Sequence, residues 1–372
     1  MRQETGRLAM ELRHQLHAYP ELSGSEGETK RQLMEFLRAH TSLELVDRGA
    51  WFYAVYRAGR GTPIAFRADF DALPIQERSE LAYRSQNPGV SHACGHDGHS
   101  AALAALALEL DGRGAERDVY LIFQHAEETG AGGEVCAGLL EEMGIEEVYA
   151  FHSISGYPAG AVCLRPGTMN CASKGLILRL EGTPAHASTP ELGRNPALAA
   201  AHLVDGLEAL TRPEDHRGLV MCTVVNIAVG EPAFGISAHR GEVRLTLRAE
   251  HQQELERLEE EVTALAAREA ARYGLTLSMD CQDVFPATVN HPAAVEKVER
   301  AAAALGMSVV RMEHPMRASE DFGHYLRRAS GALFLLGNGE GYPPLHADRF
   351  DFLDSHIPAA CEIFFQLVGL TL

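Results

Sequence analysis

The chain has 372 residues, of which 46% are hydrophobic, so it is long enough for two domains that each bury a core. Its formal net charge of -18 at pH 7 would be repelled by phosphate backbones and by anionic membrane surfaces, which excludes nucleic acid and membranes as expected partners. Residues 1–20 have the pattern of an amphipathic helix rather than that of a signal peptide, and the seven scattered cysteines do not resemble a disulfide scaffold. A cytoplasmic protein is therefore expected.

The N-terminal part of the chain alternates between helical and strand-like periodicity. Helices are predicted at 6–17, 26–40 and 97–110, and strands at 51–56, 63–70, 119–124 and 148–152. Apolar strands that end in polar residues are typical of a sheet covered by helices on both faces, where functional groups lie at the carboxyl ends of the strands.

From about residue 174 the pattern changes to the order β-α-β-β-α-β, which is that of a ferredoxin-like unit. After Phe285-Pro286 the chain returns to alternation, with helices predicted at 293–305 and 357–370 and a strand at 332–336. A self-contained unit with its ends close together can be inserted into a larger domain. The sequence therefore predicts an α/β fold, a mixed sheet flanked by helices, into which an α+β domain is inserted.

Cys94 and His96 form the first candidate metal site. In extended backbone, residues two apart project to the same side, so this thiol and imidazole could bind one metal cluster. Asp97 is well placed as the N-cap of the alanine-rich helix that follows. His92 and His99 have weaker claims, and a structural role is equally open for each.

Glu127 and Glu128 follow the predicted strand 119–124 directly. Neighbouring side chains diverge there, so one carboxylate could bind a metal while the other faces a water molecule. Adjacent glutamates are also common on solvated surfaces, and Glu146-Glu147 is expected to be such a pair.

His152, which ends a predicted strand, and His346, in a loop rich in glycine and proline, complete the set of candidate donors. Each histidine alone is weak evidence, because single histidines are more often structural. Cys94, His96, Glu128, His152 and His346 together supply five donors for two divalent ions. This mixture of soft and borderline ligands favours zinc, cobalt or manganese.

Six motifs follow one another along nearly the whole chain. They are 67–74 (RADFDALP), 92–99 (HACGHDGH), 124–128 (QHAEE), 182–190 (GTPAHASTP), 319–322 (SEDF) and 345–346 (LH). This ordered set resembles the M20 metallopeptidase family in its amidohydrolase branch, which includes aminoacylases and hippurate hydrolases. The resemblance implies a dinuclear catalytic domain formed by residues 1–174 and 285–372, with residues 175–284 as a lid or dimerisation domain.

Carried over by motif, the resemblance makes Cys94 the bridging ligand and Glu127 the general base. Asp71 would support the metal cluster from behind, and Asp69 stands where other branches of the family place a ligand histidine. His186 would bind the substrate by polarising the amide oxygen. The implied partner is an N-acyl amino acid or a short peptide, with a homodimer through the lid also open.

Three other functions remain open at this point. A carboxypeptidase or dipeptidase would use the same chemistry with another pocket, and a cysteine-nucleophile amidase would use Cys94 to attack the carbonyl. A non-catalytic binding module is the third. The segment 235–238 (GISA) departs from the Asn-Val-Ile-Pro of many relatives, which leaves recognition of the substrate carboxylate open, and Arg244 is either a carboxylate partner or a surface residue.

Overall fold

The computed structural model describes residues 1–370, which divide into two compact units. Unit 1 contains Met1–Met169, Thr288–Pro315 and the chain from Glu320 onward, and unit 2 contains Asn170–Ala287 with Met316–Ser319. Unit 2 is therefore an insertion in the sequence of unit 1. Among the described residues, no helix is both long and apolar enough to cross a membrane.

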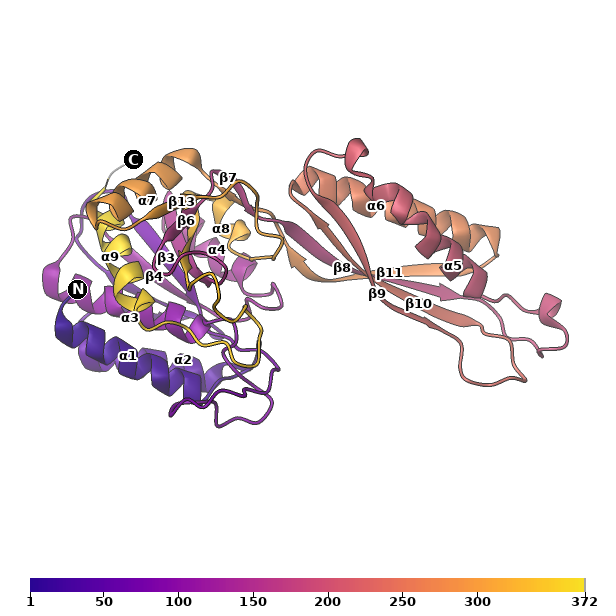
Figure 1. The fold of residues 1–372 in the computed structure, drawn as a ribbon, viewed down its shortest axis with the longest axis horizontal. Helices are drawn as coiled ribbons and strands as arrows, with labels where there is room; N and C mark the ends of the chain where they lie inside the picture. The colour runs from indigo at the N-terminus through magenta and orange to yellow at the C-terminus, as the bar shows by residue number, and fades with distance from the viewer. Residues whose placement is uncertain (371–372) are drawn as a thin grey trace. The chain divides into compact units, whose positions relative to one another are not determined.

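Unit 1 (Figure 1) is built on an eight-stranded mixed sheet, in which the strands have the order β1-β2-β4-β3-β5-β14-β6-β13. Its strands are β1 (Glu44–Asp47), β2 (Phe52–Tyr56), β3 (Ile64–Asp69), β4 (Val119–Gln124), β5 (Glu147–Ile154), β6 (Val162–Leu164), β13 (Val309–Arg311) and β14 (Ser330–Gly337). Strand β3 runs parallel to β4 and β5, and β5 runs parallel to β14. The carboxyl ends of these four strands consequently meet at one edge of the sheet.

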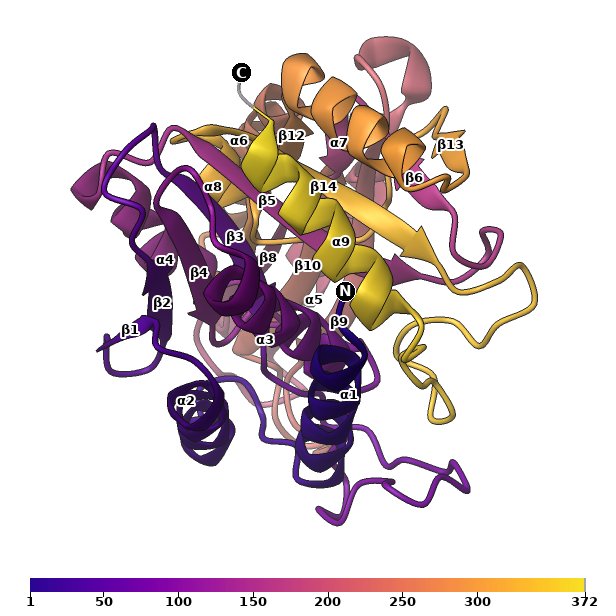
Figure 2. The same ribbon diagram turned by 90° about the vertical axis from the view of Figure 1, so that its left-hand side faces the viewer.

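The helices of unit 1 cover both faces of this sheet (Figure 2). They are α1 (Gln3–Ala18), α2 (Gly27–His40), α3 (His96–Arg113), α4 (Gly133–Glu142), α7 (Pro292–Ala304), α8 (Gly323–Leu326) and α9 (His356–Gly369), and a further two-stranded sheet pairs β7 (Gly167–Asn170) with β12 (Thr288–Asn290). Helix α3 is buried along nearly its whole length because it packs against α1, α9 and β3. Its alanine-rich sequence combines high helix propensity with small side chains that suit this enclosed position.

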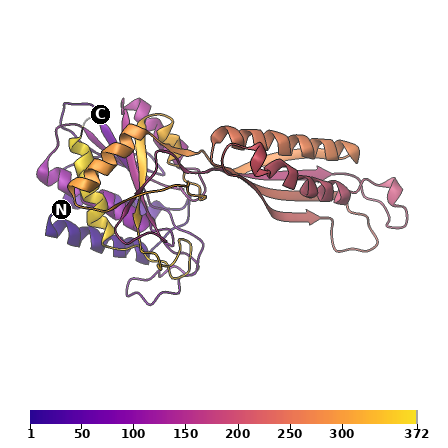
Figure 3. The same ribbon diagram turned by 45° about the horizontal axis from the view of Figure 1, so that its top comes forward.

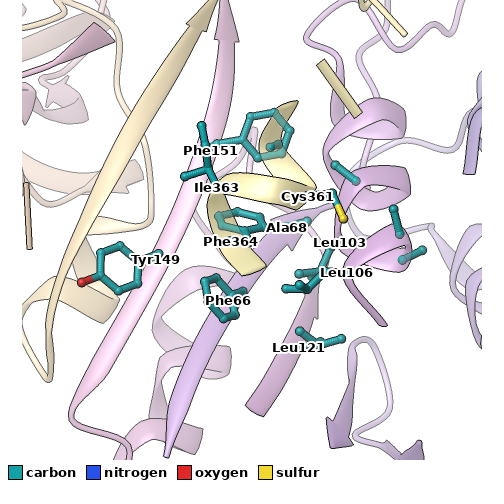
Figure 4. Packing of buried hydrophobic residues seen from close by; sticks show 14 of the residues in the cluster. Phe66, Ala68, Leu103, Leu106, Leu121, Tyr149, Phe151, Cys361, Ile363 and Phe364 are labelled. Carbon is teal, nitrogen blue, oxygen red and sulfur yellow. The ribbon is translucent and has the colours of Figure 1, made fainter. Parts of the chain in front are cut away.

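The core of unit 1 lies between β3, β5, α3 and α9 (Figure 4). The ring of Phe364 in α9 lies 4.7 Å from that of Phe66 in β3 and 5.8 Å from that of Phe151 in β5, measured between centroids. Every residue of β3 and β4 is buried, as expected for strands covered on both faces. Each fully buried phenylalanine contributes about 1.5–3 kcal/mol to folding. This packing stabilises β3 and β5, two of the strands whose carboxyl ends meet at one edge of the sheet.

Unit 2 is a four-stranded antiparallel sheet with the order β11-β8-β10-β9 and two helices on one of its faces (Figure 3). Its elements are β8 (Ala172–Glu181), α5 (Ala197–Gly206), β9 (Val220–Val229), β10 (Arg240–Ala249), α6 (Gln252–Arg272) and β11 (Thr276–Phe285), with short 3-10 turns at Pro190–Leu192, Glu208–Thr211 and Pro213–Asp215. In β10 the side chains of Val243, Leu245 and Leu247 are buried, while Arg244 points outward. The mixed sheet flanked by helices and the separate α+β unit confirm the predicted fold class.

Candidate metal centre

The five predicted donors of unit 1 converge at the carboxyl edge of the parallel strands. Among the groups of three donor atoms from the described residues that lie within 4.8 Å of one another, two contain Cys94. The first group is Cys94, His96 and His152, and the second is Cys94, Glu128 and His346. One thiol shared by two ligand sets is the arrangement that a pair of bridged ions requires.

Short separations link the members of these groups. The Sγ atom of Cys94 lies 3.4 Å from Nε2 of His152. The carboxylate oxygen Oε1 of Glu128 lies 3.6 Å from Nε2 of His346 and 3.8 Å from Nε2 of His96.

Cys94 and His96 reach this site through a turn. Gly95 between them has φ 90°, in the left-handed region, and helix α3 begins at His96. The predicted extended backbone is therefore wrong, because the left-handed Gly95 and not an extended strand brings the thiol and the imidazole together. The N-cap prediction for Asp97 is also wrong: Gly95 is the N-cap, and the Asp97 carboxylate instead accepts hydrogen bonds from Arg13 Nε and His17 Nδ1, both at 2.8 Å.

Two other residues of the site also have left-handed backbone. Ala126, immediately before the glutamate pair, has φ 48°, and His346 has φ 66°. The amide of His346 donates a hydrogen bond to the carbonyl of Ala93 at 2.8 Å, which ties this loop to the turn that carries Cys94. Non-glycine residues in this region are strained, and such strain is concentrated at functional sites.

Contacts behind two of the histidines direct their Nε2 atoms into the site. Nδ1 of His96 lies 3.0 Å from Oδ1 of Asp71, and Nδ1 of His152 donates to the carbonyl of Ser153 at 2.6 Å. When Nδ1 is engaged in this way, the neutral ring presents the lone pair of Nε2 to a metal. Asp71 therefore has the supporting place behind the cluster that was predicted for it.

The chemistry of the donor set fits two divalent cations. Nε2 of His96 and Oε1 of Glu128 are buried without a hydrogen-bond partner, although buried polar atoms normally have one. Burial and the nearby carboxylates of Glu128 and Glu127 raise the pKa of the Cys94 thiol, and burial raises the pKa of Glu128 to about 7. A cation among these crowded anionic groups would reverse both shifts.

Glu127 lies beside the donor groups, and its side chain is buried. Its Oε2 atom is 3.9 Å from Nε2 of His96, and its Oε1 atom accepts the backbone N–H of Asp321 at 3.4 Å. Burial, with the carboxylates of Glu320 and Asp321, raises the pKa of Glu127 well above its ordinary value. A carboxylate of this kind is a stronger proton acceptor than a solvated one.

Asp69 is held chiefly by residues outside the five donors, although its Oδ1 atom also lies 3.9 Å from Nε2 of His96. Its Oδ2 atom accepts from Arg67 Nη1 at 2.6 Å, and its Oδ1 atom lies 2.7 Å from Nδ1 of His99. The backbone N–H of Ser153 donates to Nε2 of His99 at 3.2 Å, so both nitrogens of this ring are engaged in structural contacts. His92 is buried, and neither ring nitrogen has a hydrogen-bond partner among the described residues.

His186 belongs to unit 2 and lies in the loop that follows β8. Its Nδ1 atom accepts the backbone N–H of Ser188 at 3.2 Å and lies 2.7 Å from the Ser188 hydroxyl. These contacts assign the neutral tautomer with its proton on Nε2. A second loop pairs with this one, since the amide of Ala187 donates to the carbonyl of Gly235 at 3.1 Å.

The family model for peptidase family M20/M25/M40 matches residues 65–369. The chain belongs to this family. Over 370 residues it is 28% identical to N-acetylcysteine deacetylase of Bacillus subtilis (strain 168), covering 97% of this chain and 96% of that protein. It is 29% identical over 340 residues to thermostable carboxypeptidase 1 of Saccharolobus solfataricus, covering 88% of this chain and 85% of that protein. The chain is thus an M20 hydrolase whose relatives include both deacetylases and a carboxypeptidase.

Solved M20 structures share the fold. The Bacillus subtilis YXEP protein, described as a dinuclear metal binding peptidase from the M20 family, has a TM-score of 0.83 and 25% identity, covering 99% of this chain and 98% of that chain.

A buried arginine that was not predicted from the sequence also supports the site. Arg67 is fully buried and donates to Gln124, Asp69 and Asp321 at 2.9, 2.6 and 2.6 Å. The sequence does contain a sign of this buried charge, because Arg67 and Asp69 interrupt the otherwise apolar strand β3.

Proposed function

We propose that this chain hydrolyses the amide bond of N-acyl amino acids and releases a free amino acid and a carboxylic acid. The observation that carries the proposal is the pair of donor groups that share Cys94, with the buried carboxylate of Glu127 beside them. The similarity to N-acetylcysteine deacetylase supports this substrate class.

In this proposal Cys94, His96 and His152 hold one divalent ion, and Cys94, Glu128 and His346 hold the other. The mixture of thiolate, imidazole and carboxylate suits zinc, manganese or cobalt. When bound, such ions polarise the scissile carbonyl and lower the pKa of water in the site.

Glu127 acts as the general base in this reaction. Its carboxylate accepts a proton from the attacking water, whose oxygen forms the new bond to the carbonyl carbon. When the C–N bond breaks, the same carboxyl group gives the proton to the departing nitrogen. Burial raises the pKa of Glu127 well above its ordinary value, which makes its carboxylate a stronger proton acceptor than a solvated one.

His186 donates a hydrogen bond from Nε2 to the carbonyl oxygen as negative charge develops there. The contact of its Nδ1 atom with Ser188 supports this role, because it leaves the Nε2 proton available.

The proposal also covers the domains: residues 175–284 serve as the lid of a catalytic domain formed by residues 1–174 and 285–372. Pairing of two lids in a homodimer belongs to the same proposal and is supported by the exposed side chains of Val225 and Ile227 on the edge strand β9. The cytoplasmic location stays a prediction.

A carboxypeptidase or dipeptidase is the second candidate, and it is favoured by the similarity to thermostable carboxypeptidase 1. A cysteine-nucleophile amidase is disfavoured by the surroundings of Cys94. The carboxyl groups of Glu128, Glu127 and Asp69 lie near the Cys94 thiol and raise its pKa, whereas a reactive thiolate needs an electropositive environment.

The experiment uses the full chain, stripped with a chelator and reloaded separately with Zn²⁺, Mn²⁺ or Co²⁺. Hydrolysis of N-acetyl and N-benzoyl amino acids is compared with hydrolysis of dipeptides, and bound metal is counted in parallel. We expect two ions per chain, higher kcat/KM on the acylated amino acids, and loss of activity with chelator that metal restores.

The other outcomes select the alternatives. Higher kcat/KM on dipeptides would replace the proposal with a peptidase. Activity that survives the chelator, together with a trapped acyl-enzyme, would make Cys94 the nucleophile. A protein that binds two ions and turns over no member of the panel would be a binding module.

A further inference from the structure

The turn that carries Glu127 and Glu128 starts from a backbone conformation that alanine rarely adopts. Ala126 has φ 48° and is buried. Left-handed backbone is unfavourable for a residue with a Cβ atom, so it persists only where the surroundings impose it. The groups that hold Ala126 therefore determine where the two glutamates lie.

Both polar groups of Ala126 are engaged. Its carbonyl accepts the backbone N–H groups of Ala131 and Gly132, each at 3.1 Å, which closes the turn from one side. Gly132 has no room for a side chain, because a Cβ atom there would lie 1.8 Å from the carbonyl oxygen of His125. From the other side, the N–H of Ala126 donates to Oε1 of Glu26 at 2.8 Å.

Glu26 is a buried carboxylate, 5% exposed, at the end of the connection between α1 and α2 (residues 19–26). The same connection is fixed to the end of β3. The amide of Ala72 donates to the carbonyl of Glu21 at 2.8 Å, and the hydroxyl of Ser23 donates to Oδ2 of Asp71 at 2.7 Å. Residues 19–26 thus contact two segments of the site: the segment after β3, at Asp71 and Ala72, and the turn after β4, at Ala126.

Two carboxylates hold alternate amides of this turn. Glu26 accepts the N–H of Ala126, and Oδ2 of Asp71 accepts the N–H of Glu128 at 3.0 Å. Asp71 also contacts His96 through its other oxygen, so its place in the site is already explained. Glu26 lies outside the part of the chain that matches the family model, which begins at residue 65.

We propose that Glu26 is a positioning residue for the metal centre: its Oε1 atom, by holding the N–H of Ala126, sets the orientation of the Glu128 and Glu127 side chains. This inference rests on the proposed role of Glu128 as a metal ligand. The required property is the reach of an acceptor oxygen and not the negative charge, since the partner is a neutral amide. An amide left unpaired in this buried place would be destabilising and would release the turn.

Two substitutions separate reach from charge. Glu26→Gln keeps the acceptor oxygen at the same distance and removes the charge, whereas Glu26→Asp keeps the charge and withdraws the oxygen by one methylene. Matched changes at Glu28, an exposed glutamate of α2 that pairs with Arg31, serve as controls. The readout is the affinity of the stripped full chain for Zn²⁺ in competition with a chromogenic chelator, with both binding steps resolved.

We expect Glu26→Asp to weaken one of the two Zn²⁺ steps by about 10- to 100-fold, the usual effect of removing a contact that orients a ligand. Glu26→Gln, Glu28→Asp and Glu28→Gln should each stay within about twofold of the unaltered protein. Unchanged zinc affinity in a folded Glu26→Asp protein would overturn the proposal, and so would equal weakening by Glu26→Gln. No substrate enters this measurement, so it stands even if the proposed hydrolysis fails.

Discussion

The two units hold their candidate functional groups in different ways. In unit 1, the donors come from the turn before α3, the turn after β4, strand β5 and the loop between β14 and α9, and contacts from distant parts of the chain orient them, such as Asp71 behind His96. In unit 2, His186 is exposed, and the hydrogen bonds of its ring are to Ser188 only two residues away. The candidate donors of unit 1 are thus held in place by contacts within that unit, whereas the position of His186 depends on a local loop.

The largest effect is expected at the donor that both ligand groups share. Cys94→Ala should abolish binding of both ions and reduce hydrolysis to background, because its thiolate belongs to each set. His346→Ala removes a donor from one group only and should leave one ion bound. Elemental analysis of the purified variants gives the two stoichiometries, with Cys281→Ala, an exposed cysteine of unit 2, as the control. Equal metal loss in Cys94→Ala and His346→Ala would contradict the shared role.

Removal of the base should separate metal binding from turnover. Glu127→Gln keeps the size of the side chain and loses the proton acceptor, so kcat should fall by about 10²- to 10⁴-fold with two ions still bound. Steady-state kinetics and metal counting on the same preparation check this, with Glu141→Gln on the surface of α4 as the control. Normal turnover by Glu127→Gln would refute its assignment.

The corresponding change in unit 2 should affect catalysis without affecting the metals. His186→Gln removes the Nε2 donor, and the loss of one hydrogen bond to a developing oxyanion typically lowers kcat by about 10²- to 10³-fold. His202→Gln is the control and should leave kcat unchanged, because His202 is a partly exposed histidine on α5 whose Nδ1 atom contacts the hydroxyl of Tyr273. If His186→Gln instead reduced metal content, the division of roles between the two units would be wrong.

Much of this arrangement could be predicted from the sequence. The periodic segments located β4 and most long helices, and the polar residues at strand ends located the donors, because burial and strand direction leave a direct mark on residue order. The short strands β6 and β13 of three residues each, and helix α4, went unpredicted. Their formation depends on partners elsewhere in the fold, which local periodicity does not report.

Buried charges were the least predictable feature. Glu147 was expected on a solvated surface, and that expectation is wrong: it is buried, and its carboxylate accepts from Lys297 Nζ at 2.5 Å and from Arg117 Nη1 at 3.2 Å. The three residues lie far apart in the sequence, so no local pattern pairs them. The same holds for Arg13 with Asp97, and for Glu26 with Ala126.

The smallest effect is expected from the group that orients His186. Ser188→Ala removes the hydroxyl 2.7 Å from Nδ1 of His186, while the backbone N–H of residue 188 still reaches that atom. A net hydrogen bond contributes about 0.5–1.5 kcal/mol, so kcat/KM should fall by about 2- to 10-fold.

The decisive measurement is made on the double variant of Ser188 and His186. If Ser188 acts through His186, adding Ser188→Ala to His186→Gln should cause no further loss, because the ring that the hydroxyl orients is gone. Additive losses would mean that Ser188 contacts the substrate directly. Unit 2 would then contribute a second polar group to substrate binding, in addition to His186.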